Sequence, residues 1–537
     1  MVVPATTGAS HSWEPLLAKL RREPGLADGT DANWHYWDHG SHWCSFAHAA
    51  DLSRQLREEL DLLWVTCEGL DDIILIGHCM GGLLIRQAYL EALGIGFTER
   101  LHSPWAERVS RIVLIATPNR GFSKISPSRN VLWLAPLAWL IRAIPMDRLI
   151  RFLPPVRSLL VSDIMRGSAF VTNLRIEWIR YFFEYPRSAP TIVQMLGSDD
   201  TAVVREDSID LRQLPHARQM SVPGAGHADI FRIDRARDPD ARYALIRSAI
   251  LDSKPGVAYQ VSCDSTNRGE LVVFVLHGIR STNRTWVRQL EEILRQRRPS
   301  VIPIVLTYGF FSAIQFALPP TRRRNLGWFQ HEYSEQLSRN PSAEFIFIGH
   351  SNATYVFGQS LVEVPGIKFT RAVLAGSVLP ENYDWRTIMR RGQLLRLYNL
   401  RANRDFPVSF LVSGLRGLGM RDIGPSGYVG FSCAEPHFKE ELFWYDGGHN
   451  SPVESHHLGS LADFALQPDT LRPTRLVERE FTRTFAAFPR LAPWIFRLGL
   501  GSTAVAAAWW IGSDLHLLRL AVLGMIVVLV AIVLDLL

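Results

Sequence analysis

Two stretches of the chain repeat one pattern, in which a short apolar strand is followed by a tight glycine turn and a helix. The first stretch begins at Asp72 and the second at Glu344, and their turns lie 272 residues apart, counted from Cys79 to Ser351. An unbroken apolar run such as Ile73–Ile76 is typical of a strand buried on both faces. Strands that alternate with helices predict a mostly parallel sheet covered by helices. The predicted fold class is therefore α/β, and 537 residues leave room for two such units in tandem.

The limits of the two units follow the places where this pattern breaks. Ala241–Leu251 predicts a closing helix, turn residues fill 253–268, and a new strand begins at Leu271. A Gln-Pro-Asp sequence interrupts the pattern again near residue 468. We therefore expect these parts: an α/β domain over residues 1–255 with an insertion at about 122–190, a second α/β domain over 268–468, a basic juxtamembrane arm over 469–497 and a hydrophobic helical hairpin over 498–537.

The second turn has the composition of a strained strand-to-helix turn that presents a nucleophile. Its residues are Gly349, His350, Ser351, Asn352 and Ala353, which match the pattern Gly-x-Ser-x-Gly except at the last position. Small residues two before and two after the serine let strand and helix approach closely, and alanine is the least disruptive substitute for glycine. The pattern indicates Ser351 as a nucleophile.

An acid candidate and a base candidate follow Ser351 along the chain, in the order nucleophile, acid, base. Asp405 comes after the apolar run Leu394–Leu400, and His449 comes soon after a second apolar run. Because the carboxyl ends of parallel strands meet at one edge of a sheet, the loops that carry these residues should converge. The spacing predicts a triad of Ser351, His449 and Asp405, and the competing interpretation is a decayed site.

Two backbone segments are candidates for stabilising an oxyanion in the second unit. The strand that begins at Leu271 ends in His277-Gly278, and the loop after it would supply one N–H group, from Ile279 or Arg280. The residue after the nucleophile would supply the other, from Asn352.

The first unit repeats this order with a cysteine in place of the serine. Cys79 is the apparent nucleophile, Asp200 the acid and His227 the base, and the N–H of Met80 would serve the oxyanion. A thiolate beside a histidine and a helix N-terminus is a competent nucleophile. However, residues 1–10 offer a strand of at most three residues and no His-Gly. Three interpretations stay open: a working cysteine site, a degenerate or regulatory domain, and a strand that begins before the given sequence.

Both units resemble α/β-hydrolase domains. Over about residues 7–250, the chain resembles the lipase-like branch that includes GPI inositol-deacylase-type lipases, and it departs from that branch at Cys79 and at the missing His-Gly. The matching segments are the elbow and residues 115–121, 165–174, 197–200 and 224–227. Residues 268–465 resemble bacterial α/β-hydrolases with a Gly-His-Ser-Asn elbow, with a mild departure at Ala353. The resemblance implies hydrolysis of esters, often acyl lipids, although such families also include members that are not hydrolases.

The insertion at 122–190 contains two strongly apolar segments, one beginning at Val131 and one at Leu149. A helix that is apolar nearly all round favours a cap packed on its own domain. The functional interpretation is a lid that covers the Cys79 pocket and contacts lipid or an acyl chain.

The end of the chain predicts a membrane attachment. Leu498–Gly512 and Leu520–Leu534 each hold 15 residues without a charge, which is short against the roughly 20 that a transmembrane helix needs. We favour a two-helix transmembrane hairpin, and the alternatives are a single anchor with an interfacial helix or a buried helical pair at a dimer interface. Residues 471–497 carry six Arg and two Glu, so the positive-inside rule places both units in the cytoplasm, at the inner membrane.

The net charge of +6 does not indicate a nucleic-acid partner. Residues 471–497 contribute +4, six Arg minus two Glu, which leaves only +2 for the rest of the chain. The five cysteines are odd in number, widely spaced and without a Cys-x-x-Cys pair, so we expect no disulfide framework, metal site or cofactor. The N-terminus lacks a secretory pattern, and free thiols fit a reducing compartment.

Two functions of different classes fit these patterns. The first is a membrane-anchored hydrolase of carboxylic esters, a lipase or esterase whose substrate is a lipid or another ester, through the Ser351 triad and a possible Cys79 triad. The second is a membrane-tethered binding or scaffold protein in which one or both units are catalytically degenerate. The oligomeric state stays open.

Overall fold

A computed structural model describes the chain. The described residues are 1–5, 10–23, 34–42, 45–67, 70, 72–96, 102–123, 159–186, 189–208, 210, 217–253, 257–258, 271–279, 286–307, 312–432, 440–467 and 483–511.

The chain divides into two compact units. Unit 1 comprises Met1–Thr266 together with Gln330–Pro341, and unit 2 comprises Asn267–Phe329 and Ser342–Leu537. The division after Thr266 falls inside the expected linker at 253–268. The second domain expected at 268–468 includes residues 330–341, whereas in the structure these residues group with unit 1, because their ionic partners lie in a sequence-distant part of that unit.

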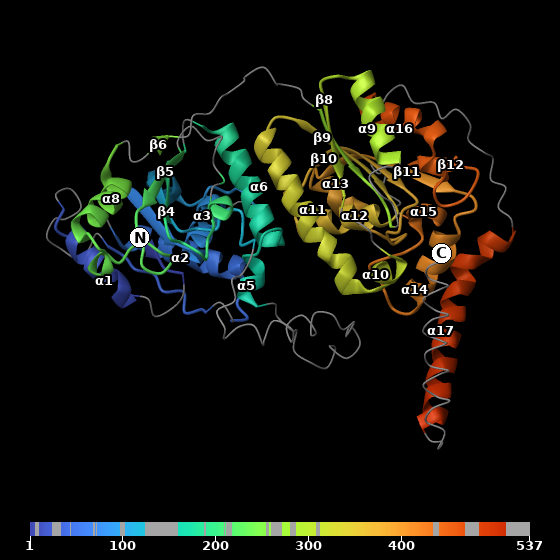
Figure 1. Ribbon diagram of the computed structural model, residues 1–537, viewed down its shortest axis with the longest axis horizontal. Helices are drawn as coiled ribbons and strands as arrows, with labels where there is room; N and C mark the ends of the chain where they lie inside the picture. Colours follow the sequence, from blue (N-terminus) through green and yellow to red (C-terminus); the bar gives the residue numbers. More distant parts are fainter. Residues whose placement is uncertain are drawn as a thin grey trace. The chain divides into compact units, whose positions relative to one another are not determined.

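Unit 1 is built on a sheet whose strands follow one another in chain order (Figure 1). Five neighbouring strands are parallel and the sixth, β6, is antiparallel to β5. The strands are β1 (Val2–Val3), β2 (Ile73–His78), β3 (Val109–Ile115), β4 (Thr191–Gly197), β5 (Ala217–Val222) and β6 (Val257–Ala258). The helices are α1 (Ser10–Leu20), α2 (Ala49–Thr66), α3 (Met80–Ala92), α5 (Leu160–Asp163), α6 (Ala169–Glu184), α7 (Arg205–Ser208) and α8 (Pro239–Leu251).

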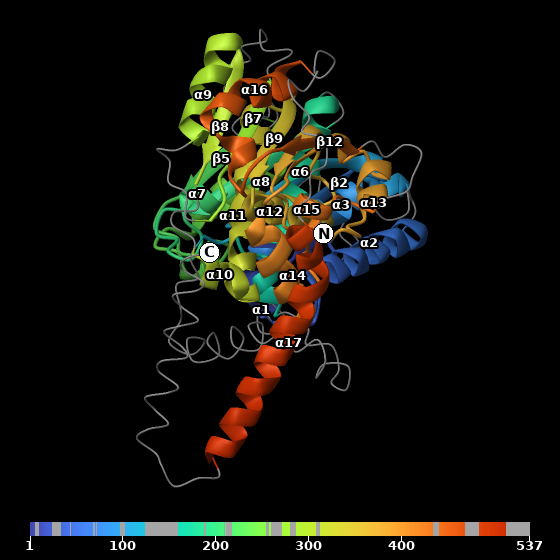
Figure 2. The same ribbon diagram turned by 90° about the vertical axis from the view of Figure 1, so that its right-hand side faces the viewer.

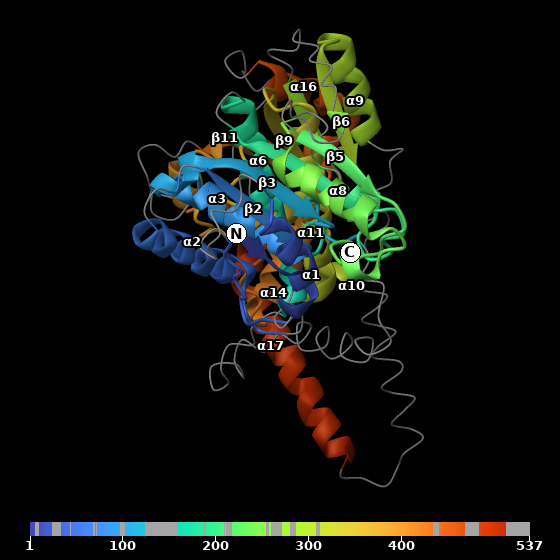
Figure 3. The same ribbon diagram turned by 90° about the vertical axis from the view of Figure 1, so that its left-hand side faces the viewer.

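Two apolar cores cover the faces of this sheet, as its unbroken apolar strands predict. On one face, Leu75 and Leu114 pack with α2, α3 and α6. On the other face, Ile76 and Val113 pack with α1 and α8, which lie together in Figure 3. Alternate residues of one strand thus enter opposite cores, and the sheet is buried on both sides.

Unit 2 is built on a fully parallel sheet with the strand order β12-β11-β10-β9-β7-β8. The strands are β7 (Leu271–Leu276), β8 (Val301–Leu306), β9 (Glu344–His350), β10 (Phe369–Ala375), β11 (Leu394–Ala402) and β12 (Glu440–Tyr445). The helices are α9 (Trp286–Arg297), α10 (Ala313–Ala317), α11 (Pro319–Arg339), α12 (Asn352–Glu363), α13 (Trp385–Arg390), the π-helix η5 (Pro407–Val412), α14 (Ser413–Gly417), α15 (Ser426–Val429), α16 (Leu458–Leu466) and α17 (Arg483–Ile511).

The strand order of unit 2 creates a switch point between β7 and β9. From β7 the chain moves to β8 on one side, then crosses back to β9 on the other side. In open α/β sheets, ligands bind outside the carboxyl ends of the strands at such a point. Helices α9 and α16 cover one face with an aliphatic core, and an aromatic cluster around Phe274 and Phe347 covers the other.

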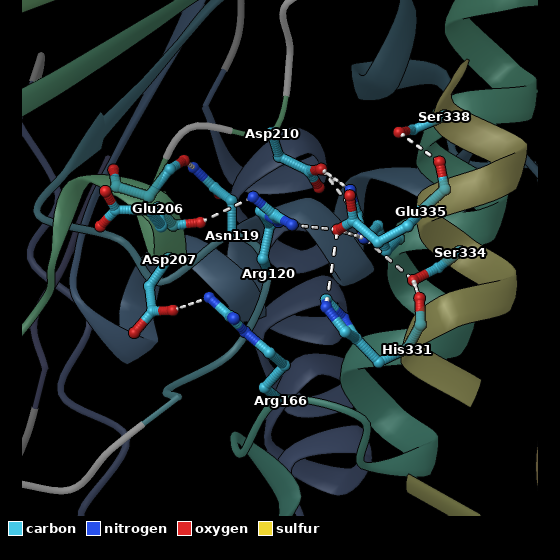
Figure 4. Close-up of polar contacts among 12 residues, drawn as sticks. Asn119, Arg120, Arg166, Glu206, Asp207, Asp210, His331, Ser334, Glu335 and Ser338 are labelled. Carbon is cyan, nitrogen blue, oxygen red and sulfur yellow. Dashed lines mark hydrogen bonds and ion pairs between the residues drawn. The ribbon is translucent and has the colours of Figure 1, made fainter. Parts of the chain in front are cut away.

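Residues 330–341, which include the second part of α11, contribute an ionic cluster to unit 1 (Figure 4). The carboxylate of Glu335 accepts a hydrogen bond from Arg175 of α6 at 2.6 Å and another from Arg120, which follows β3. Arg175 also bonds Asp210 at 2.6 Å. Each buried charge in this cluster is therefore paired with an opposite charge, as burial requires.

The expected insertion at 122–190 contains a core helix. A parallel β3–β4 connection requires a crossover on one face of the sheet, and α6 provides it. Val171, Leu174 and Trp178 of α6 are buried in the same core as Leu83 of α3. The two apolar segments that were predicted as a lid begin at Val131 and Leu149, within residues 124–158, which lie outside the described residues.

The expected hairpin at 498–537 is only partly covered by the described residues. Residues 498–511 form the second half of the single helix α17, which begins at Arg483, and the proposed second span at 520–534 lies outside the described residues. Within the part of the chain that is described, no helix combines the length and apolar character of a membrane crossing.

Two candidate active sites

The strained turns predicted at Cys79 and Ser351 are present in both units. Cys79 connects β2 to α3 with φ 52° and ψ −117°, and Ser351 connects β9 to α12 with φ 58° and ψ −122°. Besides these two, Ala116 is the other non-glycine residue with positive φ in the described chain. Such conformations are costly for L-residues and mark functional turns. Both candidate nucleophiles thus lie at the carboxyl edge of their sheets.

The small residues around each turn are required by close contacts. A Cβ on Gly77 would lie 2.5 Å from the Cα of Gly82. In unit 2, a Cβ on Gly349 would lie 3.2 Å from that of Ala353. A methyl group is therefore accommodated at Ala353 because its neighbour has none, which explains the departure from the glycine pattern.

In unit 2, the structure brings Asp405 and His449 together. The Nδ1 of His449 donates to Oδ2 of Asp405 at 2.8 Å, while Oδ1 of Asp405 accepts from the N–H of Val408 at 2.9 Å. The carboxylate of Asp405 is fully buried. With Nδ1 engaged by the acid, Nε2 of His449 is left to act as the base.

The loops that carry this acid and base are bound to each other by Asn403. Its side-chain nitrogen donates to Asp446 at 2.9 Å, and its side-chain oxygen accepts from the N–H of Gly447 at 2.9 Å. The N–H of Arg404 donates to the Gly447 carbonyl at 2.9 Å. These bonds fix the distance between the Asp405 loop and the His449 loop.

The residue before each nucleophile supports the base. His350 Nε2 lies 3.1 Å from the carbonyl oxygen of His449, and His78 Nε2 lies 2.9 Å from that of His227. Burial and the neighbouring histidine lower the pKa of both supporting rings to about 3, so each is neutral and donates its Nε2–H to the carbonyl. Neither supporting role was predicted from the sequence, where His350 was named only as part of its elbow.

The oxyanion candidates of unit 2 lie beside Ser351 where they are described. Asn352 is the first residue of α12 and is fully buried, so its N–H belongs to the positive end of the helix. A Cβ on Gly278 would lie 2.7 Å from the Cβ of Ser351. The loop that continues into Ile279 therefore passes directly over the nucleophile, whereas Arg280 lies outside the described residues.

In unit 1, the structure brings Asp200 and His227 together in the same way. His227 Nδ1 lies 3.0 Å from Oδ2 of Asp200, and Oδ1 accepts from the N–H groups of Ala202 and Val203 at 2.9 and 2.8 Å. Burial opposes ionisation of Asp200, but these bonds and His227 outweigh it and lower the pKa of the carboxyl. The acid is therefore ionised and oriented toward the base.

Cys79 is the charge partner of His227. Burial opposes the charged imidazolium, but a negative charge on the Cys79 sulfur and the Asp200 carboxylate outweigh it and raise the pKa of His227 from 6.5 to about 10. Cys79 itself is fully buried, at 0% exposure. This arrangement favours the charged form of the His227 ring beside the Cys79 sulfur.

The oxyanion side of unit 1 differs from that of unit 2. Strand β1 has only two residues, as expected, and a Cβ on Gly81 would lie 2.3 Å from the Val3 carbonyl oxygen. The chain after β1 therefore passes over the start of α3, in the position where Gly278 lies in unit 2. The N–H of the buried Met80, the first residue of α3, is the described donor candidate there.

The parallel sheet and the strained turn that presents a nucleophile define an α/β-hydrolase fold. Residues 3–244 match a model described as the alpha/beta hydrolase family. This match assigns unit 1, just under half of the chain, to the α/β-hydrolase superfamily. A search of curated proteins gives no significant match.

Several solved structures are similar to part of the chain. A monoacylglycerol lipase of Paleococcus ferrophilus is 15% identical, with a TM-score of 0.26 over 46% of this chain and 91% of that one. The 2-hydroxy-6-oxo-6-phenylhexa-2,4-dienoate hydrolase of Rhodococcus sp. strain RHA1 is 16% identical, with a TM-score of 0.29 over 46% and 89%. Phospholipase PlaB of Legionella pneumophila is 14% identical, with a TM-score of 0.25 over 39% and 42%. At these values the assignment rests on the family model and on the topology.

Proposed function

We propose that this protein hydrolyses carboxylic esters of lipophilic alcohols or acids, with Ser351 as the nucleophile. The observation that carries the proposal is the 2.8 Å hydrogen bond between His449 and a fully buried Asp405 at the sheet edge where Ser351 occupies a strained turn. This combination of a base, an orienting acid and a nucleophile at the carboxyl edge of the sheet is the geometry of acyl transfer through a serine.

The reaction then proceeds in two steps. Ser351 Oγ attacks the ester carbonyl carbon while His449 Nε2 takes its proton, and the N–H groups of Asn352 and Ile279 stabilise the oxyanion. His449 returns the proton to the departing alcohol, which leaves an acyl-serine. A water molecule, deprotonated by His449, then attacks the acyl carbon, and His449 gives this proton to Ser351 Oγ as the acid departs and the free serine is restored.

Unit 1 supports the same chemistry through a thiolate. Cys79 would form an acyl-thioester, with His227 as the acid for the leaving group and Asp200 as its orienting partner. The observation that favours this function is the Asp200–His227 contact of 3.0 Å together with the charge coupling between His227 and Cys79. The competing function is a binding domain, favoured by the two-residue β1 on the oxyanion side.

Activity-based labelling tests the serine assignment without knowledge of the substrate. A fluorophosphonate probe should label the full-length protein at Ser351, and Ser351→Ala should abolish both this labelling and turnover of a short-chain p-nitrophenyl ester. Cys79→Ala is the matched control, because it removes the other candidate nucleophile and leaves unit 2 intact. Fluorophosphonate labelling that persists in Ser351→Ala would rule out this role for Ser351.

A further inference from the structure

One side of α17 is docked on unit 2 next to the segment that carries the catalytic acid. The ring of Phe488 lies 5.6 Å from that of Phe406 and 5.4 Å from that of Phe410, and Phe496 lies 5.8 Å from Phe410. Phe406 directly follows Asp405, whose carboxylate accepts the N–H of Val408 in η5. The docked side of α17 therefore packs against the turn that holds the acid.

The described contacts of this docking lie in the first half of the helix. The positions on α14 that face it lack side chains: a Cβ on Gly414 would lie 2.5 Å from the Phe496 ring, and one on Gly417 would lie 2.5 Å from Pro493. Arg497 Nε also donates to the Gly417 carbonyl at 2.8 Å. Because the backbone of α14 approaches α17 this closely, the orientation of α17 on unit 2 is fixed.

Another side of this first half of α17 is apolar and exposed. Leu491, Trp494, Ile495 and Leu498 are 51%, 62%, 50% and 68% exposed. Their spacing of three, four and seven residues places them on one stripe of a helix. Figure 2 shows that α17 extends away from the rest of unit 2. A contiguous group of four large apolar side chains that are at least half exposed marks an interaction surface.

The charges beside this stripe identify its partner. Arg490 and Arg497 are exposed and seven residues apart, so they form a basic edge along the apolar stripe. The guanidinium of Arg497 lies 5.4 Å from the ring of Trp494. An aromatic and aliphatic stripe bordered by arginines has the amphipathic character of a helix lying in the headgroup region of an anionic bilayer.

We propose that unit 2 binds the surface of an anionic lipid bilayer through the stripe formed by Leu491, Trp494, Ile495 and Leu498, which we call the lipid stripe. The Ser351 site then takes its ester substrate from that surface. This second part rests on the proposed function. The helix is not required to cross the bilayer, since the lipid stripe lies along its side and its other side is docked on α14.

Vesicle binding of the full-length protein tests the lipid stripe directly. The double variant Trp494→Glu/Ile495→Glu should lower partitioning onto vesicles of equal parts phosphatidylcholine and phosphatidylglycerol by about tenfold or more. Leu395→Glu is the matched control, because Leu395 is also an exposed apolar residue of unit 2, at 65%. It introduces the same kind of charge elsewhere and should bind as wild type.

Charge reversal tests the basic edge in the same assay. Arg490→Glu should weaken binding to the phosphatidylglycerol vesicles and leave binding to pure phosphatidylcholine nearly unchanged, and added salt should reduce the difference. Double-variant binding equal to wild type would overturn the proposal. The proposal would also be overturned if the wild-type protein did not bind vesicles and formed a dimer that the double variant does not form. A second copy of the chain would then cover the lipid stripe.

Activity measurements separate this inference from the proposed function. The ratio of turnover of a vesicle-borne ester to turnover of a water-soluble ester should fall about tenfold in Trp494→Glu/Ile495→Glu and stay constant in Leu395→Glu. A protein that binds vesicles through the lipid stripe but hydrolyses neither ester would overturn the proposed function and leave the surface intact. Hydrolysis of both esters with an unchanged ratio would overturn the delivery of substrate from the surface.

Discussion

At the scale of single residues, the position directly after the strand that follows each elbow differs between the two units by one methyl group. Gly376, after β10, has φ +53°, and Ala116, after β3, has φ +47°. The N–H groups of both donate to the next strand, to Leu400 and Met195. A Cβ on Gly376 would lie 2.7 Å from Cε1 of His449. The ring centroids of His350 and His449 lie 4.5 Å apart, whereas those of His78 and His227 lie 5.2 Å apart. The base of unit 1 thus lies farther from its supporting histidine than the base of unit 2.

The first prediction concerns this contact. Gly376→Ala should reduce ester turnover on the order of tenfold or more, because overpacking of about 1–3 kcal/mol would displace the His449 ring. Gly392→Ala is the control: Gly392 also has positive φ, +65°, but a Cβ there meets nothing within 4 Å. Both variants carry the same backbone strain, so equal activities would show that the Gly376 contact does not matter.

The second prediction treats His350 as a positioning residue. His350→Leu removes the N–H that donates to the His449 carbonyl, a loss of about 0.5–1.5 kcal/mol. We therefore expect kcat to fall about threefold to tenfold with little change in KM, and partial recovery in His350→Gln, which retains a donor. A change in KM alone, or no recovery with glutamine, would contradict a positioning role.

The third prediction is a pH profile for Cys79. Because the pKa of His227 rises from 6.5 to about 10, the folded protein keeps this proton over that range. Its contribution to stability is complete below pH 6.5 and is lost as the pH rises through about 10. The rate of alkylation of Cys79 by iodoacetamide should therefore stay nearly flat between these limits, whereas alkylation of the same cysteine in the urea-denatured protein should increase with pH, as that of an ordinary thiol does. Parallel profiles, measured by mass spectrometry, would indicate a structural cysteine.

At the scale of elements, the sequence predicted the strands and turns better than the connections. The apolar runs at Ile73 and Leu271 and the helix at 241–251 are strong local signals, and β2, β7 and α8 confirm them. The positions of the acid and base loops could be predicted from the order of the strands alone. The role of α6 could not be predicted, because a core helix and a lid helix share the same apolar composition. Only its burial beside α3 distinguishes them.

The fourth prediction tests α6 as a core helix. Trp178 is 0% exposed and Phe183, on the same helix, is 50% exposed. Trp178→Ala should lower the free energy of unfolding of unit 1 by about 3–5 kcal/mol, while Phe183→Ala should change it by about 0.5 kcal/mol or less. Denaturant unfolding followed by circular dichroism measures both. A lid helix would tolerate both substitutions equally.

At the scale of the whole molecule, the units are not continuous in sequence. Residues 330–341 belong to unit 1, although residues 267–329 before them belong to unit 2. No local pattern in α11 reveals this assignment, because its determinant is a set of charges more than a hundred residues away. Glu335 pairs with Arg120 and Arg175, and these partners can be identified only in the folded chain.

The last prediction tests this segment through Glu335. Burial opposes its ionisation, but Arg175 and Arg120 outweigh it and lower its pKa from 4.5 to about 2. The resulting stability is present above pH 4.5 and is lost as the pH falls toward 2. Glu335→Gln should cost unit 1 about 1–3 kcal/mol at neutral pH, because Arg120 and Arg175 lose a charged hydrogen-bond acceptor that they share, and the difference from wild type should shrink at acidic pH. Glu291→Gln, which disrupts an exposed i, i+4 pair with Arg295, should cost about 0.5 kcal/mol or less. Equal effects of the two substitutions would mean that residues 330–341 do not stabilise unit 1.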